Sequence, residues 1–264
     1  MSTAVSPPAG TLCLGCHRAL AGPYCAQCGQ PASTRARITL TDLLHDIPHS
    51  IWHVDHGVLY TLRELLARPG ATLRRYLAGE RTRFFRPLAL LLLLSGLTSF
   101  LIFALNVDLL SLAPPATDDS AQARELARRS LAINRLVFKY FGWFTIAMLP
   151  VYAGLSWRLF SRLRLHFAEH LLVNAFLLSA AVVLQMSFLP LMKLASPGPW
   201  FKVFYYAETA ALPLYQVWGF SQLTAPAYSR VGGVGRALLV VVIGLVLNSV
   251  VIAGIALLIT GLQP

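Results

Sequence analysis

The chain has 264 residues, of which 56% are hydrophobic and 12% charged, and this composition excludes an ordinary water-soluble domain. The formal net charge of +11 would suit a nucleic-acid partner, but most basic residues flank long apolar stretches, where they set membrane topology or contact anionic lipid. No nucleic acid is expected as a partner, because no basic and aromatic binding module is recognisable.

A cysteine cluster near the N-terminus is the clearest motif. The only four cysteines form two C-x-x-C pairs: Cys13, Cys16, Cys25 and Cys28. Two such turns bring four thiolates to one tetrahedral ion, and the adjacent Gly15 and Gly29 allow the backbone conformations that the turns need. The spacing predicts a zinc-knuckle module over residues 13–30, in which Zn²⁺ acts structurally and replaces a core that so short a segment cannot supply. Residues 1–12 are predicted to be a disordered leader, because they lack the basic and apolar regions of a signal peptide.

Residues 38–86 are predicted to form amphipathic helices at the membrane interface. From Ile38 to Leu66, apolar residues recur at helical spacing, which places them on one face. The opposite face gathers five polar residues: Asp42, His45, His49, His53 and His56. They could form a second metal site, since imidazoles one turn apart chelate transition metals, or they could be the wetted side of a helix that lies flat on the membrane. Pro48 kinks this pattern and Gly57 is a candidate end for it.

A second helix is predicted to start at Pro69, whose ring favours the first turn, and to run to Gly79. Arginines alternate with aromatic residues in and after it: Arg74, Arg75, Arg81, Arg83 and Arg86. Guanidinium groups on lipid phosphates and aromatic rings at headgroup depth would anchor this segment. The alternative is a pocket for a phosphorylated ligand.

The remainder, residues 87–264, is predicted to be an all-α transmembrane domain, which makes the chain an integral membrane protein. The apolar runs are long enough to cross a bilayer at 1.5 Å per residue, and five spans are predicted: about 87–105, 136–157, 170–192, 203–223 and 237–260. Four spans are the alternative, because the fourth run holds Glu208, Pro213 and Gln216.

Basic residues predict the orientation of these spans. With the N-terminus inside, fifteen Lys and Arg residues lie on the cytoplasmic side and seven outside, as the positive-inside rule requires. The cysteines then lie in a reducing compartment, where a four-thiolate cluster binds metal more readily than it forms disulfides.

Polar side chains inside the spans are candidates for function, because burying them in lipid is costly. They are Glu208, Asn174, Gln185, Gln216 and Asn248. Glu208 could belong to a pathway through the membrane, or it could pair with Lys202 and reach headgroup water.

Several of these motifs, in this order, resemble an uncharacterised bacterial family called domain of unknown function 3667. The similar residues are the run Tyr24 to Gln30, Asp55-His56-Gly57, Arg68-Pro69-Gly70, Tyr76, Gly79, Arg81, Arg83, Phe84, Pro87 and Glu169-His170-Leu171. The resemblance implies a multi-pass protein of the bacterial inner (plasma) membrane with a cytoplasmic zinc ribbon and no established activity.

No catalytic motif of the P-loop, Gly-x-Ser-x-Gly or His-Glu-x-x-His type occurs in the sequence. The closed set of thiolates favours a membrane-anchored interaction or assembly factor, whose partners are the lipid bilayer and another protein. A small transporter or channel is the first alternative, if Glu208 and the polar residues of the last three spans line one cavity. A metal-dependent membrane enzyme using the cluster from His45 to His56 is the second, and it predicts more than one metal ion per chain.

Overall fold

The computed structural model describes residues 11–34, 37–40, 57–105, 124, 128–129, 140–196 and 198–261. Their helices are α2 (Gly57–Ala67), α3 (Pro69–Leu77), α4 (Pro87–Leu105), α6 (Phe141–Leu159), the short 3₁₀ helix η2 (Ser161–Leu163), α7 (Phe167–Ala195), α8 (Trp200–Thr224) and α9 (Arg230–Gly261). Extended backbone pairs in this part of the chain only as two isolated antiparallel bridges, Leu12 with Ala19 and Tyr24 with Pro31. The described protein is therefore all-helical apart from its N-terminal segment, as the sequence predicts.

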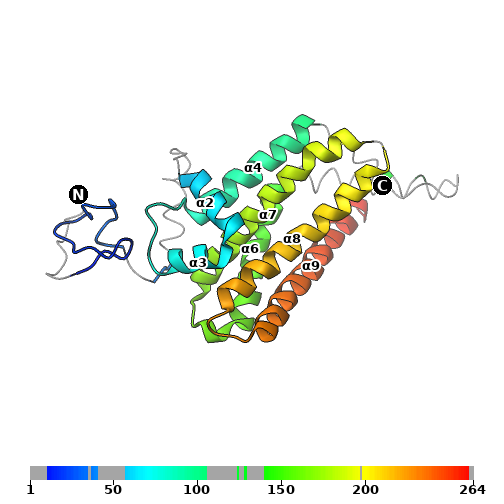
Figure 1. Ribbon diagram of the computed structural model, residues 1–264. Coiled ribbons are helices and arrows are strands. Elements are labelled where there is room, and N and C mark those ends of the chain that lie inside the picture. Colours follow the sequence, from blue (N-terminus) through cyan, green and yellow to red (C-terminus); the bar gives the residue numbers. More distant parts are fainter. Residues whose placement is uncertain are drawn as a thin grey trace.

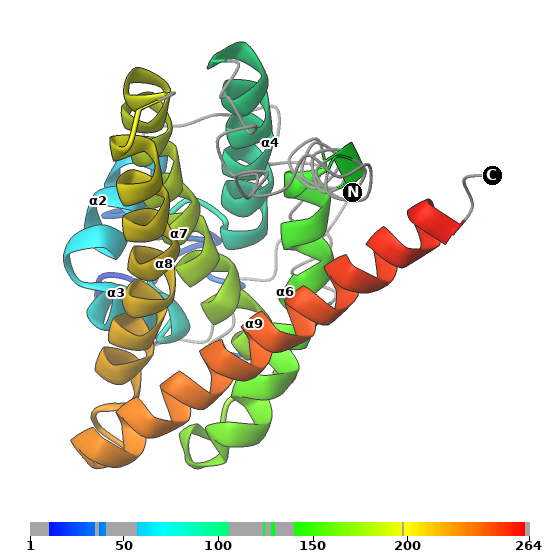
Figure 2. The same ribbon diagram turned by 90° about the vertical axis from the view of Figure 1, so that its right-hand side faces the viewer.

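Helix α7 lies at the centre of the bundle, where it contacts α4, α6 and α8 and also α2 and α3 (Figures 1 and 2). Its small side chains Ala175, Ser179 and Ala180 are fully buried, which lets neighbouring helices approach closely. Helix α9 packs on α6 and α8 and crosses the others obliquely (Figure 2). It exposes apolar side chains along much of its length, including Val242, Leu245, Val246 and Val250.

Within the described part of the chain, three helices are long and apolar enough to cross a membrane: α4, α7 and residues 230–254 of α9. Helix α4 has the bounds that the sequence predicts for the first span. Helices α6 and α8 occupy the places predicted for the second and fourth spans but are not among these three candidates; α6 contains Arg158, and α8 contains Lys202 and Glu208. Three of the five predicted spans are thus candidates by length and composition.

The α2–α3 hairpin covers one end of the bundle. Pro69 is the first residue of α3, as predicted, and Gly79 follows its C-terminus with a positive φ of 106°, a conformation that glycine adopts without strain. Gly57 was a candidate helix end in the sequence; it is the first described residue of α2, and the residues before it lie outside the described part of the chain. Thr61 holds this first turn in place, because its hydroxyl donates to the Gly57 carbonyl at 2.7 Å and accepts from the Phe85 amide at 2.7 Å.

The apolar side of α2 faces the protein. Leu65 is fully buried, and Val58, Leu62 and Leu66 pack against the same core, while Leu59 is 76% exposed. The Tyr215 hydroxyl donates to the Leu65 carbonyl at 2.9 Å and ties α2 to α8. The sequence alone suggests that the apolar face of α2 lies on lipid. In the structure this face is buried against other helices instead, because α3 and α7 offer an apolar surface beside it.

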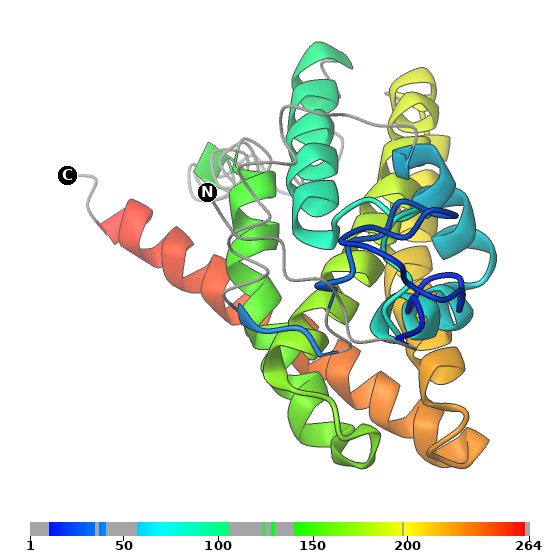
Figure 3. The same ribbon diagram turned by 90° about the vertical axis from the view of Figure 1, so that its left-hand side faces the viewer.

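One end of the bundle carries the N-terminal segment and the α2–α3 hairpin, and we call it the knuckle end (Figure 3). Helices α4, α7 and α9 start there and α6 and α8 finish there (Figures 1 and 2). Arg37 donates to the Arg164 carbonyl at 3.1 Å, and the guanidinium groups of Arg162 and Arg236 lie 5.5 and 4.7 Å from the centre of the Tyr228 ring. Basic residues that are far apart in the sequence thus gather at the knuckle end.

Candidate functional site

The two C-x-x-C segments form matching turns. In the first, the His17 amide donates to the Cys13 carbonyl at 2.9 Å; in the second, the Gly29 amide donates to the Cys25 carbonyl at 2.9 Å. Both residues that follow the second cysteine have positive φ, 58° at His17 and 72° at Gly29. The predicted need for glycine is confirmed at Gly29, whereas the first turn places a histidine in the same left-handed conformation.

The turns bring the four sulfur atoms together. The Cys13 and Cys28 sulfurs lie 3.5 Å apart, those of Cys16 and Cys25 lie 3.4 Å apart, and all four fall within 4.8 Å of one another. A tetrahedral ion with metal–sulfur bonds of about 2.3 Å needs sulfur–sulfur distances of about 3.8 Å. The four cysteines are free thiols, so this cluster could hold one metal ion.

The surroundings of the cluster lower the pKa of one thiol, Cys25, and raise the pKa of two others, Cys16 and Cys28. The backbone amides of Cys28 and Gln27 lower the pKa of the Cys25 thiol to about 6, so this ligand ionises readily at neutral pH. Burial raises the pKa of the Cys28 thiol. Four adjacent thiolates therefore need a cation to compensate their charge.

Gln30 joins the cysteine module to the helical domain. Its side chain is 2% exposed; its amide donates to the Gly79 carbonyl at 2.8 Å, and its carbonyl accepts from the Thr82 hydroxyl at 3.0 Å. Gly15 and Gly79 permit this contact, because a Cβ atom on Gly15 would strike Gln30 and one on Gly79 would lie 2.9 Å from the Cβ of Leu14. The module is thus seated on the linker between α3 and α4.

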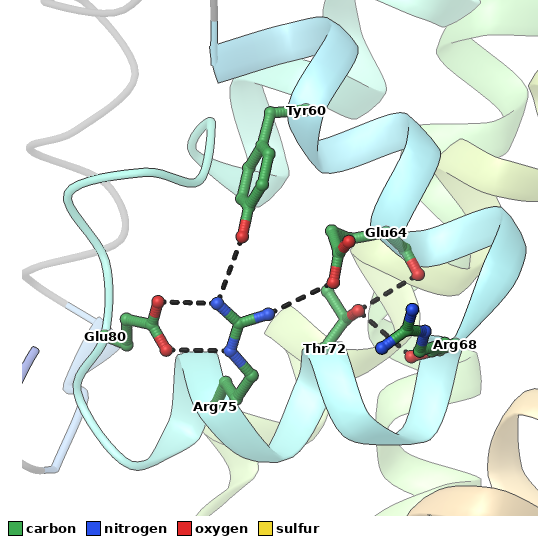
Figure 4. Close-up of polar contacts among 6 residues, drawn as sticks. All are labelled: Tyr60, Glu64, Arg68, Thr72, Arg75 and Glu80. Carbon is green, nitrogen blue, oxygen red and sulfur yellow. Dashed lines mark hydrogen bonds and ion pairs between the residues drawn. The ribbon is translucent and has the colours of Figure 1, made fainter.

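Arg75 organises the other side of the same linker (Figure 4). Its guanidinium group binds both carboxylate oxygens of Glu80, at 2.8 and 2.6 Å, and also donates to Glu64 at 3.1 Å and to the Tyr60 hydroxyl at 3.0 Å. The same group lies 5.2 Å from the centre of the Phe84 ring. Bidentate pairing of this kind fixes geometry as well as charge. Arg75 therefore ties α2, α3 and the linker together.

The ion pair predicts a pH dependence. The hydrogen bond from Arg75 lowers the pKa of Glu80 below its usual 4.5, so the pair stabilises the fold above that value and is lost as pH falls through the lowered pKa. We expect Glu80→Gln to destabilise the protein by about 0.5–1 kcal/mol at pH 7, because the pair is partly exposed. The difference from wild type should shrink below about pH 4.5, as measured by thermal unfolding in detergent. If Glu80→Gln lowered the stability equally at pH 7 and below about pH 4.5, the assignment of the stabilising ion pair to Glu80 and Arg75 would be contradicted.

The other arginines of this segment have varied surroundings. Arg74 donates to the Gln222 carbonyl of α8, and the Arg81 guanidinium lies 5.8 Å from the centre of the Tyr76 ring. Arg83 is exposed and Arg86 is half-buried. Their role as lipid anchors or as a phosphate pocket stays a prediction.

The predicted histidine face lies outside the described residues. This applies to Asp42, His45, His49, His53 and His56. The choice between a second metal site and a wetted helix face therefore rests on the sequence.

Asn174 belongs to a buried polar cluster between α6 and α7. Its side-chain amide donates to the Ser156 hydroxyl at 2.8 Å and to the His170 carbonyl at 2.8 Å. The Ser156 hydroxyl donates to the Ala153 carbonyl at 3.1 Å and lies 3.0 Å from Nδ1 of His170. Asn174 thus links two helices.

Removing the shared hydroxyl tests this cluster. Ser156→Ala would remove the hydroxyl to which both the buried His170 ring and the Asn174 amide are hydrogen-bonded, and we expect it to lower the free energy of unfolding by about 1–3 kcal/mol. Ser187→Ala is the matched control, because the Ser187 hydroxyl is exposed and donates only to the Leu184 carbonyl of its own helix. Thermal unfolding in detergent compares the two. Equal effects would show that the cluster carries no special stability.

Glu208 is buried on α8, where its side chain interacts with that of Gln185 on α7. The salt bridges of the described residues include no pair between Glu208 and Lys202. Gln185, Gln216 and Asn248, one from each of α7, α8 and α9, line a cavity of about 160 Å³ that α6 also encloses. The condition set for a transporter is met only in part, because the three amides line one cavity but Glu208 is not among its lining residues.

Sequence reasoning did not single out several residues of these sites: Gln30, Tyr60, Glu64, Glu80 and Ser156. Gln30 directly follows the second knuckle and occupies the place that Arg18 has after the first, since both carbonyls accept the amide of the first cysteine of their turn, at 2.8 Å each. This correspondence marks Gln30 as part of the module, but its burial depends on a segment about fifty residues away. The sequence carries no comparable signal for Ser156.

Comparison with known proteins matches one segment. The search of curated proteins and the search of solved structures found no match. Residues 55–99 match the family described as protein of unknown function (DUF3667). The match contains α2, α3, the linker that carries Gly79 and Glu80, and most of α4. In this segment the chain is therefore similar to the DUF3667 family.

Proposed function

We propose that the chain is an interaction or assembly factor of the bacterial inner membrane, in which a cytoplasmic zinc module presents a surface to a protein partner. The seating of the module through Gln30 carries this proposal. The buried Gln30 bonds to Gly79 and Thr82 hold the module against the membrane domain, so a partner bound to the module is placed at a fixed position on the membrane. No reaction is assigned.

Zinc is the metal that the donor set supports best. Four thiolates form a soft, closed tetrahedral set, which is typical of structural zinc and leaves no position for a substrate. The module has only two isolated bridges and no helix among its described residues. The metal would therefore supply the stability that its own packing does not.

The exposed side of the module offers apolar groups to a partner. Tyr24 is 64% exposed and Leu12 is 56% exposed, and each takes part in the bridge of its hairpin. Exposed tyrosines are frequent centres of protein interfaces, because they bury a large area at small entropic cost. These two residues are the proposed contact surface.

The proposed orientation of the helical domain in the membrane rests on the basic residues at the knuckle end. We propose that α6 and α8 cross the membrane together with α4, α7 and α9, since both of them pack against α7 and α9. Five crossings put these helix ends on one side of the membrane, and we place that side, with Arg37, Arg162 and Arg236, in the cytoplasm. This arrangement agrees with the preference of basic residues for that side.

The test compares two variants by quantitative affinity purification. The double substitution Leu12→Ser with Tyr24→Ser alters the contact surface and spares all four ligands; Gly96→Ala, on α4 with nothing within 4 Å of a new Cβ atom, is the control. We expect the surface variant to keep its zinc and lose the specific partner, while the control keeps both. A partner set that is the same in wild type and in the surface variant would overturn the proposal.

A further inference from the structure

Two arginines from different connections of the bundle meet at one tyrosine. Arg162 lies in η2, between α6 and α7, and Arg236 lies near the start of α9. Their guanidinium groups lie 5.5 and 4.7 Å from the centre of the Tyr228 ring, and these two distances limit the separation of the groups to about 10 Å. The fold therefore holds two positive charges close together at the knuckle end.

Tyr228 is a fixed support for this pair. The residue is buried, and its hydroxyl accepts from the Arg162 amide at 3.0 Å. Its ring meets the ring of the fully buried Phe160 edge-on, with 5.9 Å between the ring centres. The Arg236 guanidinium also donates to the Gly232 carbonyl at 3.0 Å. Because the two arginines are positioned in advance, a ligand that binds both loses less entropy on binding.

Within the described part of the chain, no carboxylate compensates the two charges. Three of its four glutamates form salt bridges with other arginines, and the fourth, Glu208, is buried on α8. Contact with an aromatic ring stabilises a guanidinium group but does not neutralise it. An anion from outside the chain would compensate both charges at once.

The donor geometry favours a phosphate as that anion. A guanidinium group presents planar N–H donors that match two phosphate oxygens, and such charge-assisted bonds are stronger than neutral ones. In the described part of the chain the Arg162 guanidinium makes no hydrogen bond, and that of Arg236 makes only the bond to Gly232. Donors on both side chains therefore stay available. Basic pockets at the ends of membrane helices are typical sites for phospholipid headgroups.

The surface of α9 below Arg236 favours a phosphate that carries acyl chains. Leu239, Ile243 and Val246 follow Arg236 at helical spacing, and all three are exposed. Residues 230–254 of α9 form a candidate membrane span, so this apolar stripe runs from the arginine towards the hydrocarbon. Trp157, near the end of α6, is also exposed, as is usual for tryptophan at headgroup depth.

We propose that Arg162 and Arg236 bind the phosphate of an anionic phospholipid, one acyl chain of which lies along Leu239, Ile243 and Val246. A zwitterionic headgroup is a poorer ligand, because its ammonium group would lie beside the two guanidinium groups. The site needs α9 as a membrane span but does not involve the cysteine module, so it goes beyond the proposed function. The double variant Leu12→Ser with Tyr24→Ser should therefore bind the lipid as wild type does, whether or not it loses a protein partner.

The test compares two lipids that differ only in their headgroups. The detergent-purified full chain is titrated with dioleoylphosphatidylglycerol and with dioleoylphosphatidylcholine, and bound lipid is counted by native mass spectrometry. We expect saturable binding of one phosphatidylglycerol at least about tenfold tighter than that of phosphatidylcholine, which corresponds to about 1.4 kcal/mol. Equal affinities, or no saturable binding, would overturn the proposal.

A competitor distinguishes a lipid from a soluble phosphate. Glycerol 3-phosphate has the phosphate without the acyl chains, so we expect it to leave the bound phosphatidylglycerol in place at equal concentration. Displacement of the lipid by this competitor would make the occupant a soluble phosphate compound and overturn the lipid assignment.

Variants assign the preference to the two arginines. The double substitution Arg162→Gln with Arg236→Gln should bind the two lipids about equally. Arg63→Gln with Arg68→Gln is the matched control, because it removes the same charge from two exposed arginines of the α2–α3 hairpin and should keep the wild-type preference. If the first double variant does not fold, the two lipids and the competitor on wild type still decide. A preference for phosphatidylglycerol that survives in a folded Arg162→Gln, Arg236→Gln variant would contradict the assigned site.

Discussion

Replacement of Cys13 and Cys25 by serine is expected to abolish metal binding and to release the N-terminal module from the helical domain. Each hairpin loses one ligand, and structural zinc supplies about 10–16 kcal/mol to modules of this kind. The described part of the module has no helix or sheet that could persist without the ion. Elemental analysis of detergent-purified protein should find one zinc per chain in wild type and none in the variant.

Amide hydrogen exchange measures whether the cysteine module separates from the α3–α4 linker. The linker around Gly79 and Thr82 should lose protection in the cysteine variant, because the Gln30 side chain leaves both of its partners there. Gln30→Ala is the matched control: it should expose the linker in the same way and keep its zinc. Unchanged protection of the linker in both variants would contradict the seating of the module.

The same elemental analysis tests whether the predicted histidine face, from Asp42 to His56, binds a second metal ion. A variant with His45, His49 and His53 changed to alanine should keep one zinc per chain, if the knuckles are the only site. A second metal that is present in wild type and lost in this variant would make the segment from Ile38 to Leu66 a metal site. The interpretation as a metal-dependent enzyme would then replace the proposed function.

Gly70→Ala is expected to destabilise the protein by about 3 kcal/mol, at the upper end of overpacking effects. A Cβ atom on Gly70 would strike Gln222 and lie 2.7 Å from the backbone nitrogen of Leu223. Backbone atoms cannot move aside as a side chain can, so α3 must separate from α8. The bond from the Gly70 amide to the Gln222 side chain, at 3.1 Å, is lost with the separation.

The control substitutions are expected to have the opposite effect on stability. Gly96 and Gly154 lie inside helices, and a Cβ atom at either meets nothing within 4 Å. Alanine there should stabilise the protein by about 0.5–1 kcal/mol, because glycine carries an entropic cost in helices. Thermal unfolding in detergent compares the three variants. A Gly70→Ala variant as stable as wild type would show that the close crossing of α3 and α8 is absent.

Local patterns in the sequence predicted the elements that local chemistry controls. The spacing of the cysteines predicts the two turns, Pro69 marks the start of α3, and the apolar run from Pro87 to Leu105 has the bounds of α4. These features depend on neighbours within a few residues, so no knowledge of distant segments is needed. The prediction that Gly57 ends the preceding helix stays a prediction, because the residues before it lie outside the described part of the chain.

The candidate sites depended on contacts that the sequence does not encode locally. The arginine-rich segment suggested a lipid anchor, but Arg75 is bound by Glu64 and Glu80 once α2 and α3 fold back on each other. Likewise, Asn174 was singled out because it is polar inside an apolar run, yet its partner Ser156 lies on another helix. Polarity can be read from a sequence, whereas the partner that satisfies it cannot.

The sequence by itself determined an all-helical membrane protein with a four-cysteine module at its N-terminus, because hydropathy and ligand spacing act over short distances along the chain. Only the tertiary structure decided that Gln30 seats the module on the α3–α4 linker and that Gln185, Gln216 and Asn248 meet in one cavity. The physical reason is that helix packing sets which faces of distant segments meet, and this depends on the shapes of all the side chains between them.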